Sequence, residues 1–289
     1  MYKQKIGISI LNTYQIATTK VVKMVKEIGF EAISPMWGKQ VDLAPIIETA
    51  RECGLIVQSI HGPYKKVNTM WGFDSSLSAE YKEELKQAIR DCSRFQVPIL
   101  VVHAWIGFDY TFDPNQLNFK EFDEVITYAA SLGVMIAFEN TEGEEYIHAI
   151  LEHYRENPYV GFCWDSGHEM CYNHSHDLLL AHGEQLIMTH LNDNLGIRDY
   201  EGRTHWMDDL HLLPYDGVAD WDYNIERLKK AKKQEILNVE VKNNSHPNRH
   251  ENELYEQMRL QVFLTEAYKR ACKIAYRYAN VTGKFKSEE

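Results

Sequence analysis

The 289-residue sequence lacks the features that mark a secreted or membrane-spanning chain. Its five cysteines are odd in number and show no C-x-x-C spacing. No run of about 18 apolar residues is long enough to cross a membrane. The N-terminal segment MYKQKIGISI leads directly into a strand-like run, so we expect no secretory signal. These absences predict a reduced, cytoplasmic protein.

The sequence also lacks a linker between two halves. Proline and glycine are scattered singly, and there is neither a Ser/Gly run nor a low-complexity segment. The hydrophobic fraction of 44% is ordinary for a globular protein and sufficient for a large core. We therefore predict one domain over residues 1–289.

Positive charge is scarce, since 31 Lys and Arg stand against 42 Asp and Glu, a net charge of -11. Such a chain repels a polyanion such as DNA unless a local basic patch overrides the net charge. The basic clusters are short, and one of them, Lys229, Lys230, Lys232 and Lys233, lies on a predicted surface helix. We expect no nucleic-acid or membrane partner. The oligomeric state is left open, a homo-oligomer included.

Short apolar runs alternate with longer segments of helical period, the pattern of repeated βα units. Some runs, such as 99–102, are continuously apolar, as in strands buried on both faces. The predicted strands are Lys5–Ile10, Phe30–Met36, Leu55–Ile60, Pro98–Ala104, Val134–Asn140, Val160–Asp165, Leu186–Asn192 and Glu235–Val241. The predicted helices are Thr19–Ile28, Asp42–Cys53, Ser78–Phe95, Phe119–Leu132, Glu144–Glu156, His176–Gln185, Asp220–Lys233 and a long amphipathic helix at about 251–278.

Eight strands, each followed by a helix, predict an α/β protein with a single (β/α)8 barrel, for which about 250 residues is typical. The long helix at about 251–278 is expected to close the barrel. The alternative is a doubly wound open sheet. That fold normally carries a Gly-rich first βα turn, and the segment ILNTYQIATTK has no glycine.

Most of the predicted strands end in a side chain that can bind a metal. In a barrel, the C-terminal ends of all strands open on one face, so these side chains would converge there. The strand-end residues are His61, His103, Glu139, Asp165, His190 and Glu240. Asp165 follows Cys163 by two residues, and Glu240 follows Asn238 by two, so each can share the inward face of its strand.

A strand-end carboxylate can also cap the next helix, as Asp165 could. Carboxylates buried together, however, are costly unless a cation lies between them. The consecutive set Glu139, Asp165, His190 and Glu240 therefore predicts a divalent-metal site. Its mostly oxygen ligands suit Mn²⁺, Mg²⁺ or Co²⁺, and Zn²⁺ is also compatible.

Further candidate ligands lie on nearby loops. His168 begins the loop after the sixth strand, and Asp209 and His211 form a D-x-H pair after the seventh. With His61 and His103, these residues could hold a second or third metal or contact a substrate. The simpler alternative is that the loop histidines contact solvent.

Aromatic residues are frequent in the same loops, where they could stack on a sugar or pack the loops onto the barrel rim. They are Trp37, Tyr64, Trp71, Trp105, Trp164, Trp206 and Tyr215. Trp105 is a candidate for substrate contact. Lys242, two residues past Glu240, either contacts a substrate oxygen or is an ordinary surface lysine.

Seven motifs occur in a fixed order: HGPY (61–64), VVHAW (101–105), FEN (138–140), CWDSGH (163–168), HLNDN (190–194), D-x-H (209–211) and VEVK (239–242). The ordered set resembles the xylose-isomerase-like barrels over nearly the whole chain. That superfamily includes sugar-phosphate isomerases and epimerases, ketose 3-epimerases, hydroxypyruvate isomerase and the endonuclease IV type of apurinic nuclease.

The resemblance implies different roles in the two branches. In the isomerases and epimerases, residues matching Glu139, Asp165, His190 and Glu240 hold one divalent metal, and the glutamates double as the proton-transfer pair. The residue matching His168 contacts substrate there. In the nuclease branch, three zinc ions are bound by residues matching His61, His103, Glu139, Asp165, His168, His190, Asp209, His211 and Glu240.

Three features favour the isomerase branch: the negative charge, the long aromatic segment LGIRDYEGRTHWM, and HLLPYDGVADW, which resembles an isomerase loop although Tyr215 and Asp216 interrupt its turn.

We predict a metal-dependent sugar isomerase or epimerase acting through an enediolate on a small ketose, aldose or related hydroxy-carbonyl compound. The absence of a Gly-rich phosphate cradle favours an unphosphorylated substrate. The alternatives are a phosphodiesterase on abasic DNA and a non-catalytic barrel subunit.

Overall fold

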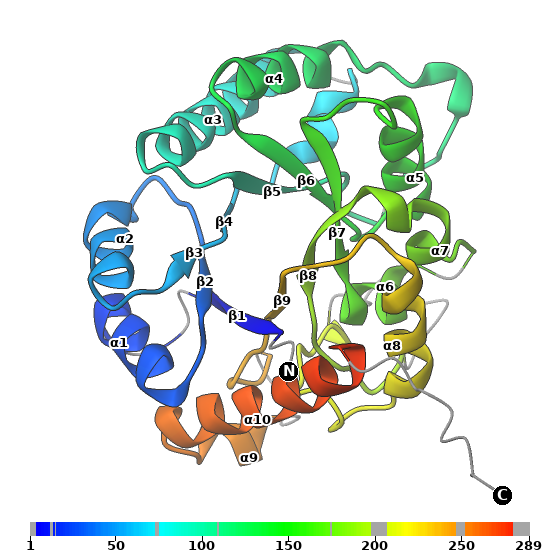
Figure 1. Ribbon diagram of the computed structural model, residues 1–289. Helices are drawn as coiled ribbons and strands as arrows, with labels where there is room; N and C mark the ends of the chain where they lie inside the picture. Colours follow the sequence, from blue (N-terminus) through cyan, green and yellow to red (C-terminus); the bar gives the residue numbers. More distant parts are fainter. Residues whose placement is uncertain are drawn as a thin grey trace, which may run out of the picture.

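The computed structural model describes residues 4–11, 14, 16–72, 75–108, 110–173, 175–197, 207–246 and 252–279. Within these ranges, parallel strands form the wall of a barrel and helices surround it (Figure 1). The strands are β1 (Lys5–Ile10), β2 (Ala32–Pro35), β3 (Ile56–Val57), β4 (Ser59–His61), β5 (Ile99–His103), β6 (Met135–Glu139), β7 (Val160–Asp165), β8 (Leu186–His190) and β9 (Ile236–Val239). The predicted (β/α)8 barrel is confirmed.

Two sheets make up the ring, with the strand orders β3-β2-β1-β9 and β4-β5-β6-β7-β8. Parallel bridges between Met36 and His61 and between Leu191 and Val239 join the sheets at the two seams. The predicted strand 55–60 is divided at Gln58, because β3 pairs with β2 whereas β4 pairs with β5. This division follows from the stagger between neighbouring strands that a closed barrel requires.

The helices lie outside the strands and match most of the predicted ranges within a few residues. They are α1 (Thr18–Ile28), α2 (Leu43–Glu52), α3 (Ser75–Arg94), α4 (Lys120–Ser131), α5 (Glu144–His153), α6 (Ser166–Tyr172), α7 (Leu178–His182), α8 (Trp221–Lys230), α9 (Glu253–Glu256) and α10 (Leu260–Ala279), with 3-10 turns η1 (Val67–Trp71), η2 (Pro114–Gln116) and η3 (Gly183–Gln185). Among the described residues, no helix is both long and apolar enough to traverse a bilayer.

The helix predicted at about 251–278 is divided into α9 and α10 in the structure. A continuous helix would place Tyr255 and Phe263 about 12 Å apart, at about 1.5 Å per residue. The break brings their rings to a centroid distance of 5.3 Å. It also lets the Tyr255 hydroxyl donate to Asp216 Oδ2 at 2.6 Å. Tertiary packing at the barrel rim therefore overrides the helical periodicity of this segment.

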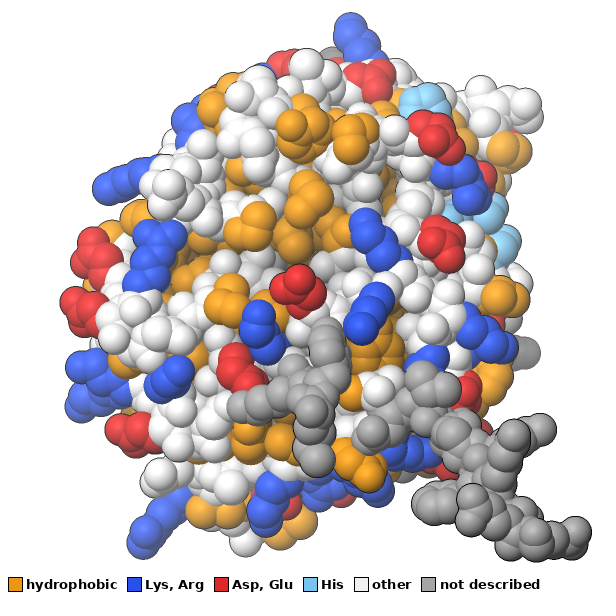
Figure 2. Space-filling view, in the orientation of Figure 1, with side chains coloured by type: hydrophobic (Ala, Val, Ile, Leu, Met, Phe, Trp, Pro, Cys, Tyr) orange, Lys and Arg blue, Asp and Glu red, His pale blue; other side chains and the backbone are white. Residues whose placement is uncertain are grey.

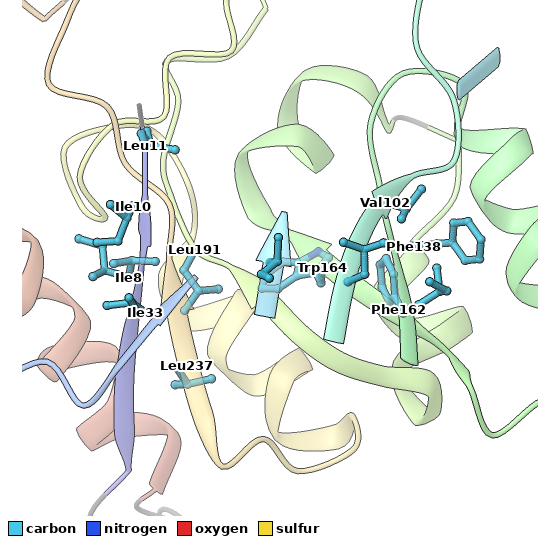
Figure 3. Close-up of a cluster of buried hydrophobic side chains, with 14 of the residues drawn as sticks. Ile8, Ile10, Leu11, Ile33, Val102, Phe138, Phe162, Trp164, Leu191 and Leu237 are labelled. Atoms are coloured by element: carbon cyan, nitrogen blue, oxygen red, sulfur yellow. The ribbon is translucent and has the colours of Figure 1, made fainter. Parts of the chain in front are cut away.

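Alternate residues of each strand face two separate cores. Val102, Phe138, Phe162 and Trp164 belong to the large core between strands and helices (Figure 3). The residues that point to the other side of these strands form a small cluster of buried side chains: Ile99, Val101, Ala137, Cys163 and Met188. Ser59 Oγ of β4 lies 3.8 Å from Met188 Sδ of β8, a contact between distant strands that crosses the barrel interior. The small cluster therefore fills the inside of the barrel.

Candidate metal centre

The metal-capable residues predicted at the strand ends converge at one end of the barrel. Each follows an inward-facing residue by two positions, so strand alternation directs it inward as well. The pairs are Ser59 and His61, Val101 and His103, Ala137 and Glu139, Cys163 and Asp165, Met188 and His190, and Asn238 and Glu240. All six metal-capable residues are buried.

Glu139 at the end of β6 is the centre of this cluster, with a side chain that is fully buried. Its Oε2 lies 3.2 Å from His61 Nε2 and 3.5 Å from His103 Nε2. Its Oε1 lies 2.8 Å from His190 Nδ1 and 3.4 Å from His168 Nδ1. One carboxylate thus contacts imidazoles from four different segments of the barrel mouth.

The predicted principal ligands lie around His190. Its Nδ1 is 2.8 Å from Glu139 Oε1 and 3.3 Å from Glu240 Oε2, so one nitrogen contacts both glutamates. Asp165 Oδ2 lies 3.9 Å from His168 Nδ1 and borders the same group. Glu139, Asp165 and His168 each offer a ligand atom within 4.8 Å of the others.

The D-x-H pair forms a further group with His168. Asp209 Oδ2 is 3.3 Å from His168 Nε2 and 3.0 Å from His211 Nε2. His211 adopts a left-handed φ of 47°, an uncommon conformation for a residue with a side chain. Its carbonyl accepts a hydrogen bond from Lys242 N at 2.9 Å, which links the loop to the end of β9. The loop histidine is therefore buried against the centre instead of contacting solvent.

Buried oxygens without partners indicate that these residues fit a cation. Among the described residues, Glu139 Oε2 and Asp209 Oδ1 are buried and accept no hydrogen bond. A buried carboxylate oxygen without a donor is unfavourable unless a positive charge lies beside it. The donor set of carboxylates and imidazoles suits a divalent metal.

Asp165 also has the capping role considered from the sequence. Its Oδ1 accepts hydrogen bonds from Gly167 N at 2.8 Å and His168 N at 2.7 Å, and it thereby begins the unpredicted helix α6. Asn192 Nδ2 donates to both of its carboxylate oxygens, at 3.0 and 2.9 Å. Asn140 exchanges two hydrogen bonds with the Asp165 backbone. The capping and metal-binding roles are compatible, because Oδ2 remains directed toward His168.

The HLNDN motif contributes positioning residues that sequence reasoning did not identify. Asn194 Oδ1 accepts from the backbone N–H groups of Leu210 and His211, and its Nδ2 donates to Gly167 O. The backbone of Asp193 pairs with Leu212 in both directions. Its carboxylate accepts from Tyr215 N, Ala219 N and Trp221 Nε1 at 2.9–3.0 Å. These contacts fix the D-x-H pair relative to the end of β8.

Charges in the centre balance one another. Burial raises the pKa of Glu139, but His190, His103 and His168 outweigh burial and hold it well below its usual range. Burial likewise opposes ionisation of Glu240, whose pKa is nevertheless lowered to about 2, chiefly by His190. Burial lowers the pKa of His168 and His190, yet nearby acidic groups raise both well above the usual value. Protons on the two imidazoles thus offset part of the negative charge of Glu139 and Glu240.

This balance predicts that metal affinity falls as the pH is lowered. A histidine whose pKa is raised in the folded state keeps its proton through neutral pH, so a metal must displace that proton from His168 or His190. Each displaced proton should weaken binding about tenfold per pH unit of acidification. Competition against a chromophoric chelator at several pH values measures this slope. A pH-independent affinity would contradict the assignment of these imidazoles as ligands.

A cavity of about 380 Å³ opens above the centre. Its wall includes His61, His103, Glu240 and Lys242, so the predicted position of Lys242 beside the site is found in the structure. Glu142, which was not singled out from the sequence, also lines it, and burial raises the pKa of its carboxyl group. Glu139 is not part of the wall and lies beneath the histidines.

The aromatic residues named from the sequence mostly pack the loops. Tyr64 lines the cavity and stacks on His103 at 4.9 Å. Trp105, a predicted substrate contact, lies outside the cavity wall; its ring stacks on Tyr146 at 4.0 Å and its Nε1 donates to Gly107 O. Trp206 lies outside the described residues, and the other four are not on the wall: Trp37, Trp71, Trp164 and Tyr215.

The barrel and its ligand cluster agree with the family comparison. The chain belongs to the xylose isomerase-like TIM barrel family, whose model matches residues 22–262.

The individual proteins that this chain resembles share little sequence identity with it. An uncharacterized protein of Sinorhizobium fredii, y4fM, is 29% identical over 171 residues, which are 55% of this chain and 52% of that protein. The chain therefore spans about half the length of the curated relative it matches. The solved structure of IolI with a zinc atom has a TM-score of 0.76 at 16% identity, covering 96% of this chain and 100% of IolI. D-psicose 3-epimerase in the presence of D-fructose has a TM-score of 0.71 at 14% identity, with coverage of 96% and 100%.

Proposed function

We propose that this protein is a divalent-metal-dependent isomerase or epimerase of a small sugar or a related hydroxy-carbonyl compound. The observation that carries the proposal is the contact of Glu139 and Glu240 with one nitrogen of His190, at 2.8 and 3.3 Å, next to a cavity of about 380 Å³ whose wall includes Glu240. Cavities of this size, roughly 300–1,000 Å³, suit small molecules. The likeness to D-psicose 3-epimerase adds support at the level of fold.

The residues that would hold the metal are Glu139, Asp165, His190 and Glu240. When bound, a divalent cation supplies Lewis acidity, which makes a C–H group beside a chelated carbonyl more acidic. Glu240 lies on the cavity wall and is held ionised, so its carboxylate can accept a proton from the substrate carbon. Glu139 approaches from the end of β6 and is the candidate for proton return. Lys242 can donate a hydrogen bond to a substrate oxygen.

Deuterium exchange tests the proposal directly. The metal-loaded protein in D2O should introduce deuterium at one carbon of at least one ketose in a panel of unphosphorylated and phosphorylated sugars, because the proposed enediolate route removes a carbon-bound proton in both isomerisation and epimerisation. Mass spectrometry and NMR locate the exchanged position and identify the product. Absence of exchange across the panel with fully loaded protein would count against this function.

A second candidate function is metal-dependent hydrolysis at abasic sites in DNA. It is favoured by the grouping of the nine predicted ligands, which include the sets His61–His103–Glu139 and His168–Asp209–His211. The net charge of -11 opposes it, and on the face in Figure 2 basic and acidic side chains are interspersed.

We expect no measurable binding to duplex DNA at physiological salt. Fluorescence anisotropy with matched abasic and intact duplexes, followed by a cleavage assay with the zinc-loaded protein, measures this. Tight, salt-sensitive binding to the abasic duplex together with strand cleavage would place the nuclease first.

A further inference from the structure

A second group of histidines lies on the outside of the barrel, between α5 and α7. His148 and Glu152 are four residues apart on α5 and therefore share one helix face, and His182 ends α7. Each offers a ligand atom within 4.8 Å of the others. The His182 ring lies 6.4 Å from that of Phe162, an outward-facing residue of β7 (Figure 3). The wall of the barrel thus separates this group from the centre around Glu139.

Two of these side chains already direct nitrogen atoms at each other. His148 Nδ1 lies 2.9 Å from His182 Nε2. His182 is buried and His148 half-buried, whereas Glu152 is exposed to solvent. Figure 2 shows histidine side chains at the surface on the side of the molecule where α5 and α7 lie. The group is therefore accessible to an ion from solvent through Glu152, while its inner ligand is fixed by packing.

Gln185 determines which nitrogen of His182 is free. Its Nε2 donates to Leu151 O at 3.0 Å, which orients its Oε1 toward His182 Nδ1 at 3.3 Å. Because an amide oxygen only accepts, His182 Nδ1 carries the proton and Nε2 keeps its lone pair. Metal-binding histidines commonly donate their second N–H to a carbonyl in this way, which fixes the tautomer. The lone pair of His182 Nε2 is thus directed toward His148.

Both imidazoles are in the neutral charge state that a metal requires, although in the metal-free contact His148 Nδ1 donates to His182 Nε2, so metal binding shifts the His148 proton to its Nε2. Burial and the neighbouring His148 lower the pKa of His182 to about 4. Burial and the neighbouring His176 also lower the pKa of His148. Neutral histidines bind metal without first losing a proton. Two nitrogens bound to one tetrahedral zinc ion lie about 3.3 Å apart, so the pair needs to open by only a few tenths of an ångström.

We propose that His148 Nδ1, His182 Nε2 and the Glu152 carboxylate bind one borderline divalent cation of the Zn²⁺ type, outside the barrel mouth. Imidazole with one carboxylate favours Zn²⁺ over Mg²⁺ or Ca²⁺. Arg155 pairs with Glu152 at the surface, an exposed contact that a metal can replace at small cost. The bound ion joins α5 to α7 and stabilises the side of the barrel formed by β6 to β8. The proposal is independent of the function assigned to the mouth.

Zinc stoichiometry with matched variants tests the site. In equilibrium dialysis against Zn²⁺, the full chain with His148→Ala should bind one ion fewer per chain than wild type. His153→Ala is the control, because His153 is exposed on the same helix, stacks on Phe119 and belongs to neither metal group. It should bind as many ions as wild type. Gln185→Leu should weaken the binding of the same ion about tenfold or more, because it removes the acceptor that fixes the tautomer of His182.

Folding is checked by circular dichroism for each variant. If His148→Ala fails to fold, Glu152→Ala provides the test instead, since the Glu152 side chain is exposed and its removal should not disturb folding. This variant should weaken the binding of the same ion at least about tenfold. Zn²⁺ should also raise the melting temperature of His148→Ala less than that of wild type and His153→Ala. Wild-type stoichiometry and affinity in folded His148→Ala or Glu152→Ala would overturn the proposal, as would an equal loss in the His153→Ala control.

Discussion

Replacing Glu240 with Gln should slow carbon-bound proton exchange about 100- to 10,000-fold, the contribution expected of a general base. Gln retains the shape and one oxygen donor of the glutamate but cannot accept a proton. Glu240 lies on the cavity wall, and its pKa of about 2 keeps it ionised in the wild-type protein. The measurement is deuterium incorporation into the responsive ketose, with metal content determined on the same sample. Metal supplied in excess separates loss of basicity from loss of metal.

Glu139→Gln should reduce exchange as severely, with an additional loss of metal. Glu139 contacts four imidazoles and is fully buried, so removal of its charge disturbs the whole centre. Lys242→Met is the informative comparison, because it alters the cavity wall without touching a carboxylate. It should mainly raise KM. If both Gln variants, fully metal-loaded, exchange at the wild-type rate, the two-glutamate mechanism is wrong.

His190→Ala should remove the principal metal and with it the exchange activity. His190 Nδ1 contacts both glutamates, at 2.8 Å from Glu139 Oε1 and 3.3 Å from Glu240 Oε2. Its loss removes the imidazole that contacts both buried glutamates, which should lower the free energy of unfolding of the metal-free protein by about 3–5 kcal/mol. Metal analysis after dialysis and chemical denaturation with and without metal measure the two effects.

Two variants are compared with His190→Ala: Asp165→Asn changes a second predicted ligand, and His153→Ala is the control. Asp165→Asn keeps an oxygen to accept from Gly167 N and His168 N, so it should lose metal affinity while α6 stays formed. His153→Ala lies outside the mouth and should leave both metal content and activity at the barrel mouth unchanged. An undiminished metal content in folded His190→Ala and Asp165→Asn would refute the assignment of these ligands.

The barrel was predictable because buried parallel strands have a simple sequence pattern. The run at 99–102 became β5, and β1 and β7 have the predicted bounds. Convergence of the metal-capable residues followed from the same pattern, since each stands two positions after an inward-facing residue. Side-chain identity at strand ends therefore carried most of the information about the candidate centre.

Features that depend on tertiary contacts were not predictable. The cap of α6 is local, and Asp165 was considered for it from the sequence, whereas the break before α10 serves the contact between Tyr255 and Phe263. Trp105 follows a ligand strand in sequence, yet its ring is held by Tyr146 of α5. The local sequence does not determine which residue a side chain contacts across the barrel rim.

The double attachment of the HLNDN motif has an evolutionary consequence. Asp193 and Asn194 form hydrogen bonds directly with the backbone of residues 210–212. These bonds position His211 without help from residues 195–206, the segment that connects HLNDN to the D-x-H pair. The connecting segment can therefore accept substitutions, insertions or deletions while the ligands keep their places. Selection can diversify substrate preference there without first rebuilding the chemistry. The same property makes residues 195–206, which precede the D-x-H pair, a suitable place for grafting loops from relatives in the laboratory.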